Sequence, residues 1–415
     1  MSILQSLAGF LVFAALAWCM SENRARFPLK TVAVGLGAQF GLAVLLLKFE
    51  FFTRVFVYLN RAVLALEEST RAGTAFVFGY IGGGDKPFAV TDPQATYILA
   101  FQALPLVLVI SALSSVFFYW KILPRIVKGF SRLLEKSLGI GGAEGLGVSA
   151  NIFVGMVESP LLIRPYVAKL SRSELFTVMT SGMATIAGTV LVLYASILDP
   201  VISNVTGHIL TASIISAPAA IVVSKIMIPE SGALTAGELK APEEACSAMD
   251  ALTRGTIQGI ELFLNIIAMI IVLVALVHLV NIMLGTAPDV RGAPLTLERI
   301  FGWIMAPVVW LMGVPWGEAH TAGALLGTKT VLNEFIAYIN MSRLPEGSLG
   351  ERSLLIMSYA LCGFANPGSL GIMIGGLGAM APERRNEIVS LGIRAIVAGT
   401  IATCMTGAVV GALHF

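Results

Sequence analysis

Two glutamates, Glu158 and Glu334, lie in apolar stretches of the chain that glycine, proline and asparagine interrupt. Glu158 stands between Gly155 and Pro160, and Glu334 directly follows Asn333. An ionised side chain at membrane depth costs about 2.5–3.5 kcal/mol on insertion scales, so each glutamate needs a partner or a water-filled cavity. We interpret both carboxylates as hydrogen-bond acceptors for hydroxyls or ring nitrogens of a ligand in one shared cavity.

Three other ionisable residues lie in apolar stretches: Glu261, Glu318 and Lys329. Lys329 precedes Glu334 by five residues, so an internal ion pair between these two side chains is the structural alternative to ligand binding. The functional interpretation is favoured because unwound backbone beside a carboxylate has little structural justification.

Asn366 and Ser369 form a second polar pair, one helical turn apart on a segment that glycine and proline break. Both side chains can therefore point at the same ligand. The alternative is helix contact through small residues, which is common in membrane bundles. Phe364, close by, can either stack on an aromatic ring of the ligand or pack in the protein.

A cation site is predicted from oxygen donors alone. The side chains of Asn151 and Thr185 and the backbone carbonyls of Val154 and Ile186 supply oxygen ligands, the type that a small hard cation such as sodium prefers. The four cysteines show no CxxC spacing, so we expect no cysteine metal site and no cofactor beyond this cation.

The composition predicts an all-α membrane protein. The 415 residues are 56% hydrophobic and only 13% charged, and the mean hydropathy is +0.85. A net charge of +2 is too small to indicate nucleic-acid binding. About 20 apolar residues cross a bilayer as a helix, and eight segments are predicted to do so: residues 3–19, 31–47, 95–120, 175–197, 208–227, 257–283, 353–380 and 388–413.

Three other stretches do not fit simple spanning helices. Residues 51–66 have the apolar spacing of an amphipathic helix on the membrane surface, with an ordinary packed helix as the alternative. Residues 139–166 and 306–340 are apolar but interrupted, and each is predicted to enter the membrane and turn back as a re-entrant hairpin. Such irregular backbone persists at membrane depth only where protein or a water-filled cavity surrounds it.

The segments that follow the two predicted hairpins resemble one another. SGMATIAGTVL follows the first and CGFANPGSLGI follows the second, which indicates an internal repeat, with chance similarity as the alternative. Lys and Arg collect in alternate loops, which favours both termini facing the periplasm. The two halves then have opposite orientation, a design of many secondary transporters.

The chain is accordingly divided into four parts. Residues 1–137 form scaffold helices and a surface helix, and residues 138–227 form the first hairpin and its repeat half. Residues 228–300 form a cytoplasmic loop and a scaffold helix, and residues 301–415 form the second hairpin, its repeat half and the last helix.

A family resemblance joins these features. The run from Gly327 and Lys329 through NEFIAY at residues 333–338 resembles the GxKxxxNEFVA signature of the concentrative nucleoside transporters, with Ile336 at the usual valine. ANIFVG, ATIAG and GFAN followed by GS also resemble that family in order and spacing. The similarity covers essentially the whole chain.

The resemblance implies a homotrimer of eight-helix protomers in the bacterial inner membrane. Each protomer has two re-entrant hairpins and a transport domain that moves like an elevator, and nucleosides enter with sodium or a proton. The residues that it assigns to the substrate site are Met156, Val157, Glu158, Val190, Asn333, Glu334, Phe364, Asn366 and Ser369. Among these, Glu334, Asn366 and Ser369 are implied to contact the ribose, and the first hairpin the base. Asn151, Val154, Thr185 and Ile186 are implied to hold sodium.

One departure from the family pattern affects specificity. Members carry Gln and a polar neighbour where this chain has Met156 and Val157, so two side chains that address the base have become apolar. Looser or different base selectivity is therefore expected. Alternative functions are a cation-coupled carrier of another ribosyl or heterocyclic compound, a channel, or an intramembrane enzyme, the last disfavoured because no GxSG or HExxH motif is present.

Overall fold

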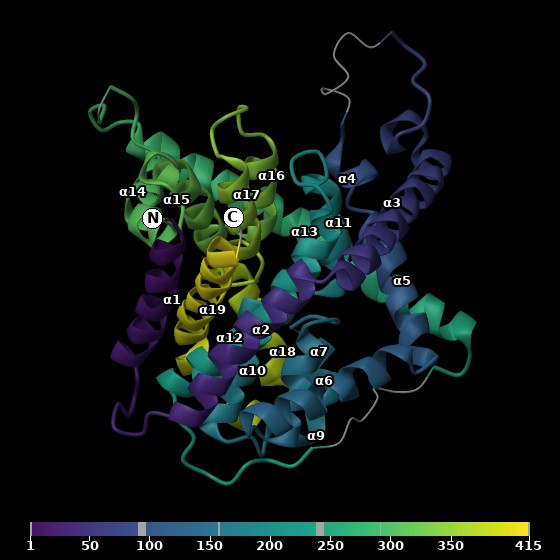
Figure 1. Cartoon of the computed structure of the whole chain (residues 1–415). Coiled ribbons are helices and arrows are strands. Elements are labelled where there is room, and N and C mark those ends of the chain that lie inside the picture. The colour runs from purple at the N-terminus through teal and green to yellow at the C-terminus, as the bar shows by residue number, and fades with distance from the viewer. Residues whose placement is uncertain (1, 90–96, 157, 238–244, 291, 414–415) are drawn as a thin grey trace.

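The computed structural model describes residues 2–89, 97–156, 158–237, 245–290 and 292–413, and almost all of its regular structure is helical (Figure 1). Helices suit this sequence because backbone polar groups in lipid must find their hydrogen bonds within the chain. In the part of the chain that the structure describes, five stretches are long and apolar enough to cross a membrane. They are α2 (Leu29–Lys48), α4 and α5 together (Leu99–Tyr119), α12 (Val205–Met227), α13 (Ala248–Leu284), and η3 with α19 (Pro382–Leu413).

The remaining helices, and the separate parts of the two composite stretches, complete the architecture. Their bounds are α1 Ser2–Cys19, α3 Glu50–Phe78, η1 Gly79–Gly82, α4 Leu99–Gln102, α5 Leu106–Tyr119, α6 Ile122–Leu138, α7 Gly142–Asn151, α8 Glu158–Leu162, α9 Arg164–Val167, α10 Arg172–Ala184, α11 Gly188–Leu198, α14 Leu297–Leu311, α15 Trp316–Val331, α16 Glu334–Ser342, α17 Glu351–Ala360, α18 Pro367–Met380, η3 Pro382–Arg384 and α19 Arg385–Leu413.

Two of the predicted continuous spans are broken in the structure. Residues 175–197 form α10 and α11, and residues 353–380 form α17 and α18. Prediction by apolar length missed these breaks because their causes are local. Asn366 caps the start of α18 and Pro367 follows it, while Gly363 has a φ of +153°.

The two breaks lie against each other. A Cβ atom on Gly363 would lie 2.8 Å from the carbonyl oxygen of Met183 and 3.0 Å from that of Ala184, at the end of α10. The chain therefore needs glycine here for close backbone approach as well as for its positive φ. This contact brings the non-helical backbone of both breaks together inside the bundle.

The two interrupted stretches are also bent in the structure. Residues 139–166 contain α7, α8 and α9, and residues 306–340 run from the end of α14 through α15 into α16. α14 and α15 turn by 116° at the short break between them. The predicted surface helix is longer than expected, because α3 spans Glu50–Phe78.

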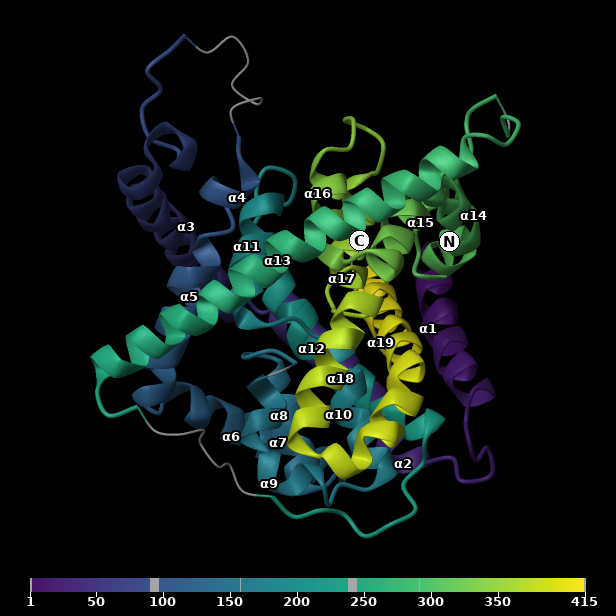
Figure 2. The same ribbon diagram turned by 180° about the vertical axis from the view of Figure 1, so that it is seen from behind.

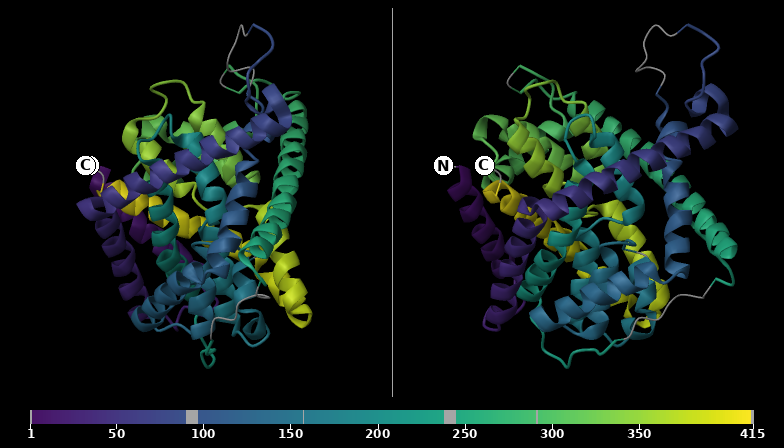
Figure 3. Two further views of the ribbon diagram at one scale, coloured as in Figure 1. Left: turned by 90° about the vertical axis from the view of Figure 1, so that its right-hand side faces the viewer. Right: turned by 45° about the vertical axis from the view of Figure 1, so that its right-hand side comes forward.

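The centre of the molecule is formed by α12 and α19, which pack against each other and are surrounded by α1, α2, α10 and α17. In the most apolar window of α12, 94% of the residues are buried, whereas none is buried in that of α13. α13 instead packs chiefly against α5, and the two run along one side of the molecule (Figures 2 and 3).

α6 is an amphipathic helix that lies outside the eight predicted spans. Its Val127, Leu134 and Leu138 are buried, and the helix packs chiefly against α7. Its basic side chains are exposed on the opposite face: Arg125, Lys128, Arg132 and Lys136. The basic pattern thus belongs to a helix that packs against α7 in the first interrupted stretch.

Candidate functional site

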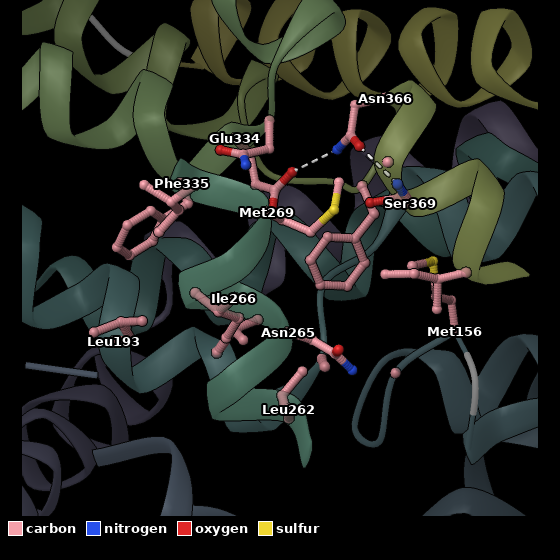
Figure 4. Close-up of a pocket in the computed structure, with 18 of the residues that line it drawn as sticks. Met156, Leu193, Leu262, Asn265, Ile266, Met269, Glu334, Phe335, Asn366 and Ser369 are labelled. Atoms are coloured by element: carbon pink, nitrogen blue, oxygen red, sulfur yellow. Dashed lines mark hydrogen bonds between the residues drawn. The ribbon is translucent and has the colours of Figure 1, made fainter. Parts of the chain in front are cut away.

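A cavity of about 160 Å³ lies where the helix breaks meet α11 and α13 (Figure 4). It is lined by Gly155, Met156, Ala187, Val190, Leu193, Tyr194, Leu262, Asn265, Ile266, Met269, Ile270, Leu273, Asn333, Glu334, Phe335, Phe364, Asn366, Gly368, Ser369 and Ile372. The lining is mostly apolar, and a few polar groups converge on it, as is usual for small-molecule sites.

Glu334 begins α16 and is 4% exposed. Its Oε1 accepts a hydrogen bond of 2.6 Å from the hydroxyl of Tyr194, and its Oε2 accepts one of 3.0 Å from Nδ2 of Asn366. Two fixed donors therefore orient the carboxylate at the cavity wall. Asn333 lines the cavity too, but its Oδ1 accepts from the backbone N–H of Ile336 at 2.9 Å, so it also caps α16.

Asn366 and Ser369 lie side by side at the start of α18. Oδ1 of Asn366 accepts a 2.8 Å hydrogen bond from the backbone N–H of Ser369, which caps α18. The hydroxyl of Ser369 has no hydrogen-bond partner among the described residues and remains available at the cavity wall. Glu334, Asn366 and Ser369 thus form one linked polar end of the cavity (Figure 4).

The alternative ion pair between Lys329 and Glu334 is not formed in the described part of the chain. Nζ of Lys329 instead donates to the carbonyl oxygen of Ala360 at 2.8 Å and to the hydroxyl of Thr403 at 2.9 Å. Ala360 ends α17, where the break leaves backbone carbonyls without helical partners. The buried ammonium therefore stabilises the C-terminal end of α17, where a cation is favourable.

The first interrupted stretch contributes Gly155 and Met156 to the cavity, and Met156 is 8% exposed. Val190 and Phe364 also line the cavity. Val157 and the side chain of Glu158 lie outside the described residues, so their predicted contacts with the substrate stay predictions.

The predicted cation ligands collect near the break between α10 and α11. The hydroxyl of Thr185 donates to the carbonyl oxygens of Ser181 at 2.9 Å and Asn151 at 3.4 Å. The side-chain oxygen and nitrogen of Asn151 are buried without a hydrogen-bond partner among the described residues. The backbone N–H of Gly188 donates to the carbonyl of Phe153 at 3.0 Å, which ties the end of α7 to this break.

Further buried oxygens without hydrogen-bond partners in the described chain lie on α7 and α10. They are the hydroxyls of Ser149, Thr180 and Ser181. Buried polar groups are normally hydrogen-bonded, so this group of oxygens has the composition expected of a site for a small hard cation. The backbone carbonyls of Val154 and Ile186 belong to the same two breaks.

Two polar residues of the cavity, Tyr194 and Asn265, are absent from the sequence prediction of the site. Tyr194 holds Glu334 from α11, a contact across 140 positions that no local pattern indicates. Asn265 had a usable signal. In residues 262–279 of α13, only Asn265 and His278 are polar, and a lone amide in such a helix marks a position that faces something other than lipid.

A second buried charged cluster lies at the base of α7 and was also missed. Nζ of Lys225, on α12, lies 2.9 Å from Oε1 of Glu144 and 3.2 Å from Oε2 of Glu230. It also donates to the hydroxyl of Ser173 at 3.2 Å. Glu144 is fully buried, so the cluster joins α7 to α12 through a charge that water does not reach.

Comparisons with known proteins identify the family. The family model described as the C-terminus of Na⁺-dependent nucleoside transporters matches residues 208–411, and its N-terminal counterpart matches residues 8–81. A third model, described as nucleoside recognition, matches residues 100–201.

Individual relatives span the whole chain. The uncharacterised transporter YutK of Bacillus subtilis is 38% identical over 99% of both chains. Nucleoside permease NupC of Helicobacter pylori is 32% identical over 99% of this chain and 97% of its own.

Solved structures agree with this assignment. CNTnw in an inward-facing substrate-bound state matches with a TM-score of 0.90 at 33% identity, over 99% of this chain and 98% of CNTnw. A CNTnw variant in an outward-facing state matches with a TM-score of 0.92 at 32% identity, over 99% and 98%. These relatives are transporters and not enzymes, and the chain belongs to the family of concentrative, Na⁺-dependent nucleoside transporters.

Proposed function

We propose that this protein is a symporter that imports nucleosides together with a coupling cation, sodium or alternatively a proton, across the bacterial inner membrane. The observation that carries the proposal is the uneven polarity of the cavity. A carboxylate, an amide and a hydroxyl gather at Glu334, Asn366 and Ser369, while apolar side chains line most of the remainder. A nucleoside is divided in the same way, into a hydroxyl-rich ribose and a flat heterocycle.

In this proposal, the polar end binds the ribose. Ribose hydroxyls donate to the carboxylate of Glu334 and exchange hydrogen bonds with Asn366 and Ser369. Val190 and Phe364 pack against the remainder of the substrate. Asn333, Met156, Val157 and Glu158 complete the site, and the apolar side chains at 156 and 157 predict poor discrimination between purines and pyrimidines.

The coupling cation is proposed to bind between the first interrupted stretch and the break after α10. Asn151 and Thr185 supply side-chain oxygens, and Val154 and Ile186 supply carbonyls. The supporting observation is that the side-chain oxygen of Asn151 is buried and has no hydrogen-bond partner in the described chain. An all-oxygen site favours sodium over the softer metals.

Transport is proposed to follow an elevator-type movement within a homotrimer. Residues 139–166 and 306–340 act as re-entrant hairpins of two inverted repeats, in a protomer with eight spans and the four-part division given above. The contact between the two central breaks at Gly363 supports the repeat. The packing of α13 chiefly against α5, at one side of the molecule, supports a scaffold against which the two repeat halves move.

The position of the chain ends supports a common side for both termini. The start of α1 and the end of α19 lie together (Figure 1), where Arg352 donates to the hydroxyl of Ser6 at 3.2 Å and to the carbonyl of Gly411 at 2.6 Å. The basic residues of the alternate loops favour the periplasm for that side.

Uptake into proteoliposomes tests the proposal. Labelled uridine and adenosine are expected to accumulate under an inward sodium gradient and not without one. Glu334→Gln is expected to raise the nucleoside concentration for half-maximal uptake by about 10- to 150-fold, because a hydrogen bond to a charged group contributes about 1.5–3 kcal/mol. Accumulation under a proton gradient alone would reject the sodium site and keep the substrate. If neither nucleoside accumulates under either gradient, a carrier of another ribosyl or heterocyclic compound becomes the better assignment.

A further inference from the structure

The cavity has polar side chains on two sides, and the proposed function uses only one of them. Glu334, Asn366 and Ser369 lie together at one end. Asn265, on α13, lies apart from them, beyond the apolar side chains of Met269 and its neighbours (Figure 4). The amide of Asn265 is therefore separated from the ribose-binding group by the apolar middle of the cavity.

The amide of Asn265 has no hydrogen-bond partner among the residues that the structure describes. Its side chain is exposed, and it lies on the face of α13 that also presents Leu262, Ile266 and Met269 to the cavity. In a membrane helix, an asparagine usually bonds to a neighbouring helix. The free donor and acceptor of Asn265 face the cavity instead.

The cavity wall around Asn265 offers little else for polar recognition. Met156, across the cavity, has a thioether and no hydrogen-bond donor. The hydroxyl of Tyr194 already donates to Glu334. Among the described lining side chains, the amide of Asn265 is thus the one group away from the ribose end that both donates and accepts a hydrogen bond.

We propose that Asn265 binds the polar edge of the nucleobase and sets which heterocycles are accepted. This inference rests on the proposed function, since it assigns the second end of the same substrate. An amide places one donor beside one acceptor, which matches the paired donor and acceptor on the edge of adenine. Rotation of the amide by about 180° exchanges the two groups, so the same side chain also fits the carbonyl and N–H of uracil.

The substrate is then held by two groups of helices. The ribose lies against α16 and α18, and the base reaches α13, which packs chiefly against α5. The two groups of helices approach each other closely at the cavity, because a Cβ atom on Gly368 at the start of α18 would lie 2.9 Å from Cε of Met269 on α13. A base between these walls is therefore within reach of α13 while its ribose bonds to Ser369.

The test uses Asn265→Leu and Asn265→Ala in proteoliposomes, with competition against labelled uridine uptake. The competitors are uridine, adenosine and a riboside in which benzene replaces the base, which has a ribose but no polar edge. Both variants are expected to bind uridine and adenosine about 5- to 150-fold more weakly, the range for a bidentate amide contact. Their affinity for the benzene riboside is expected to equal that of the unmodified protein.

Gln258→Leu is the matched control. Gln258 is an exposed amide on the same helix and does not line the cavity, so all three affinities are expected to stay unchanged. Unchanged affinity of both Asn265 variants for uridine and adenosine would overturn the inference, and so would an equal loss for the benzene riboside. If the unmodified protein takes up no nucleoside, the proposed function itself fails, which separates the two outcomes.

Discussion

Replacing Lys225 by methionine removes the cation from the buried cluster that joins α7 to α12. The side chains of Lys225 and Glu144 are 6% and 0% exposed, and Nζ lies 2.9 Å from Oε1. Glu230, the second carboxylate at 3.2 Å, is 21% exposed and reaches solvent. Glu144 is therefore the group that loses its partner without gaining water.

The expected cost is set by that burial. Removing one partner of a buried ion pair destabilises a protein by about 3–5 kcal/mol, because the remaining charge is uncompensated. Adding Glu144→Gln removes that charge, so the double variant is expected to recover most of the loss. Arg54→Met breaks a pair with Glu50 whose side chains are 73% and 78% exposed, and such a pair contributes about 0–1 kcal/mol.

The midpoints of thermal unfolding in detergent micelles measure the relative stabilities of these variants. The midpoint is expected to fall most for Lys225→Met, to return towards the unmodified value in the double variant, and to change little for Arg54→Met. Nucleoside uptake is expected to follow the same order, because the cluster supports the base of the first interrupted stretch. The reasoning is refuted if Lys225→Met lowers the midpoint no more than Arg54→Met does, or if the double variant is as unstable as the single one.

Three further predictions concern the breaks and the surface. In Gly188→Ala, the new Cβ would lie 2.5 Å from the carbonyl oxygen of Phe153, so the backbone of the two segments must separate at a cost of about 1–3 kcal/mol. The sodium concentration for half-maximal uptake is therefore expected to rise. Gly129→Ala, with open space around the new Cβ, is the control, and the same sodium half-saturation in both variants would contradict the prediction. Lys329→Met leaves the carbonyl of Ala360, the last of α17, without the ammonium donor, at a cost of about 1–3 kcal/mol. Both the unfolding midpoint and the affinity for nucleoside are expected to fall. Unchanged affinity would show that this end of α17 does not support the site. The guanidinium of Arg172 donates a 2.9 Å hydrogen bond to the carboxylate of Glu22 and holds the pKa of Glu22 below its ordinary 4.5. The ionised Glu22 therefore stabilises the folded state above about pH 4.5, and this stabilisation is lost as the pH falls through the lowered pKa. Both side chains are partly exposed, so this effect is at most about 1 kcal/mol; the difference in midpoint between Glu22→Gln and the unmodified protein should shrink on acidification, and a constant difference from pH 7 to pH 3 would argue against it.

Composition and local pattern determined the class of the protein and much of its site. Apolar length predicts membrane helices because the bilayer imposes one cost on every exposed backbone polar group. The polar residues that interrupt those helices are expensive at that depth, which is why Glu334, Asn366 and Ser369 could be selected before any geometry was known. The cavity brings all three together.

Apolar length alone did not predict the broken helices, although glycine and proline indicated an interruption beside Asn366. Apolar length predicts a continuous span over residues 353–380, whereas the cap by Asn366 and the close approach of Gly363 to α10 divide it. The close approach depends on a contact between segments far apart in the sequence, so hydropathy carries no record of it.

Tertiary structure alone decided the partners of the polar groups. Lys329 stands five residues before Glu334 in the sequence, yet it bonds to Ala360 instead, and Tyr194 holds the carboxylate. Asn265 faces the cavity only because α13 crosses the open side of the broken helices. Sequence patterns report which groups are costly to bury, but the partner that offsets the cost depends on packing between distant helices.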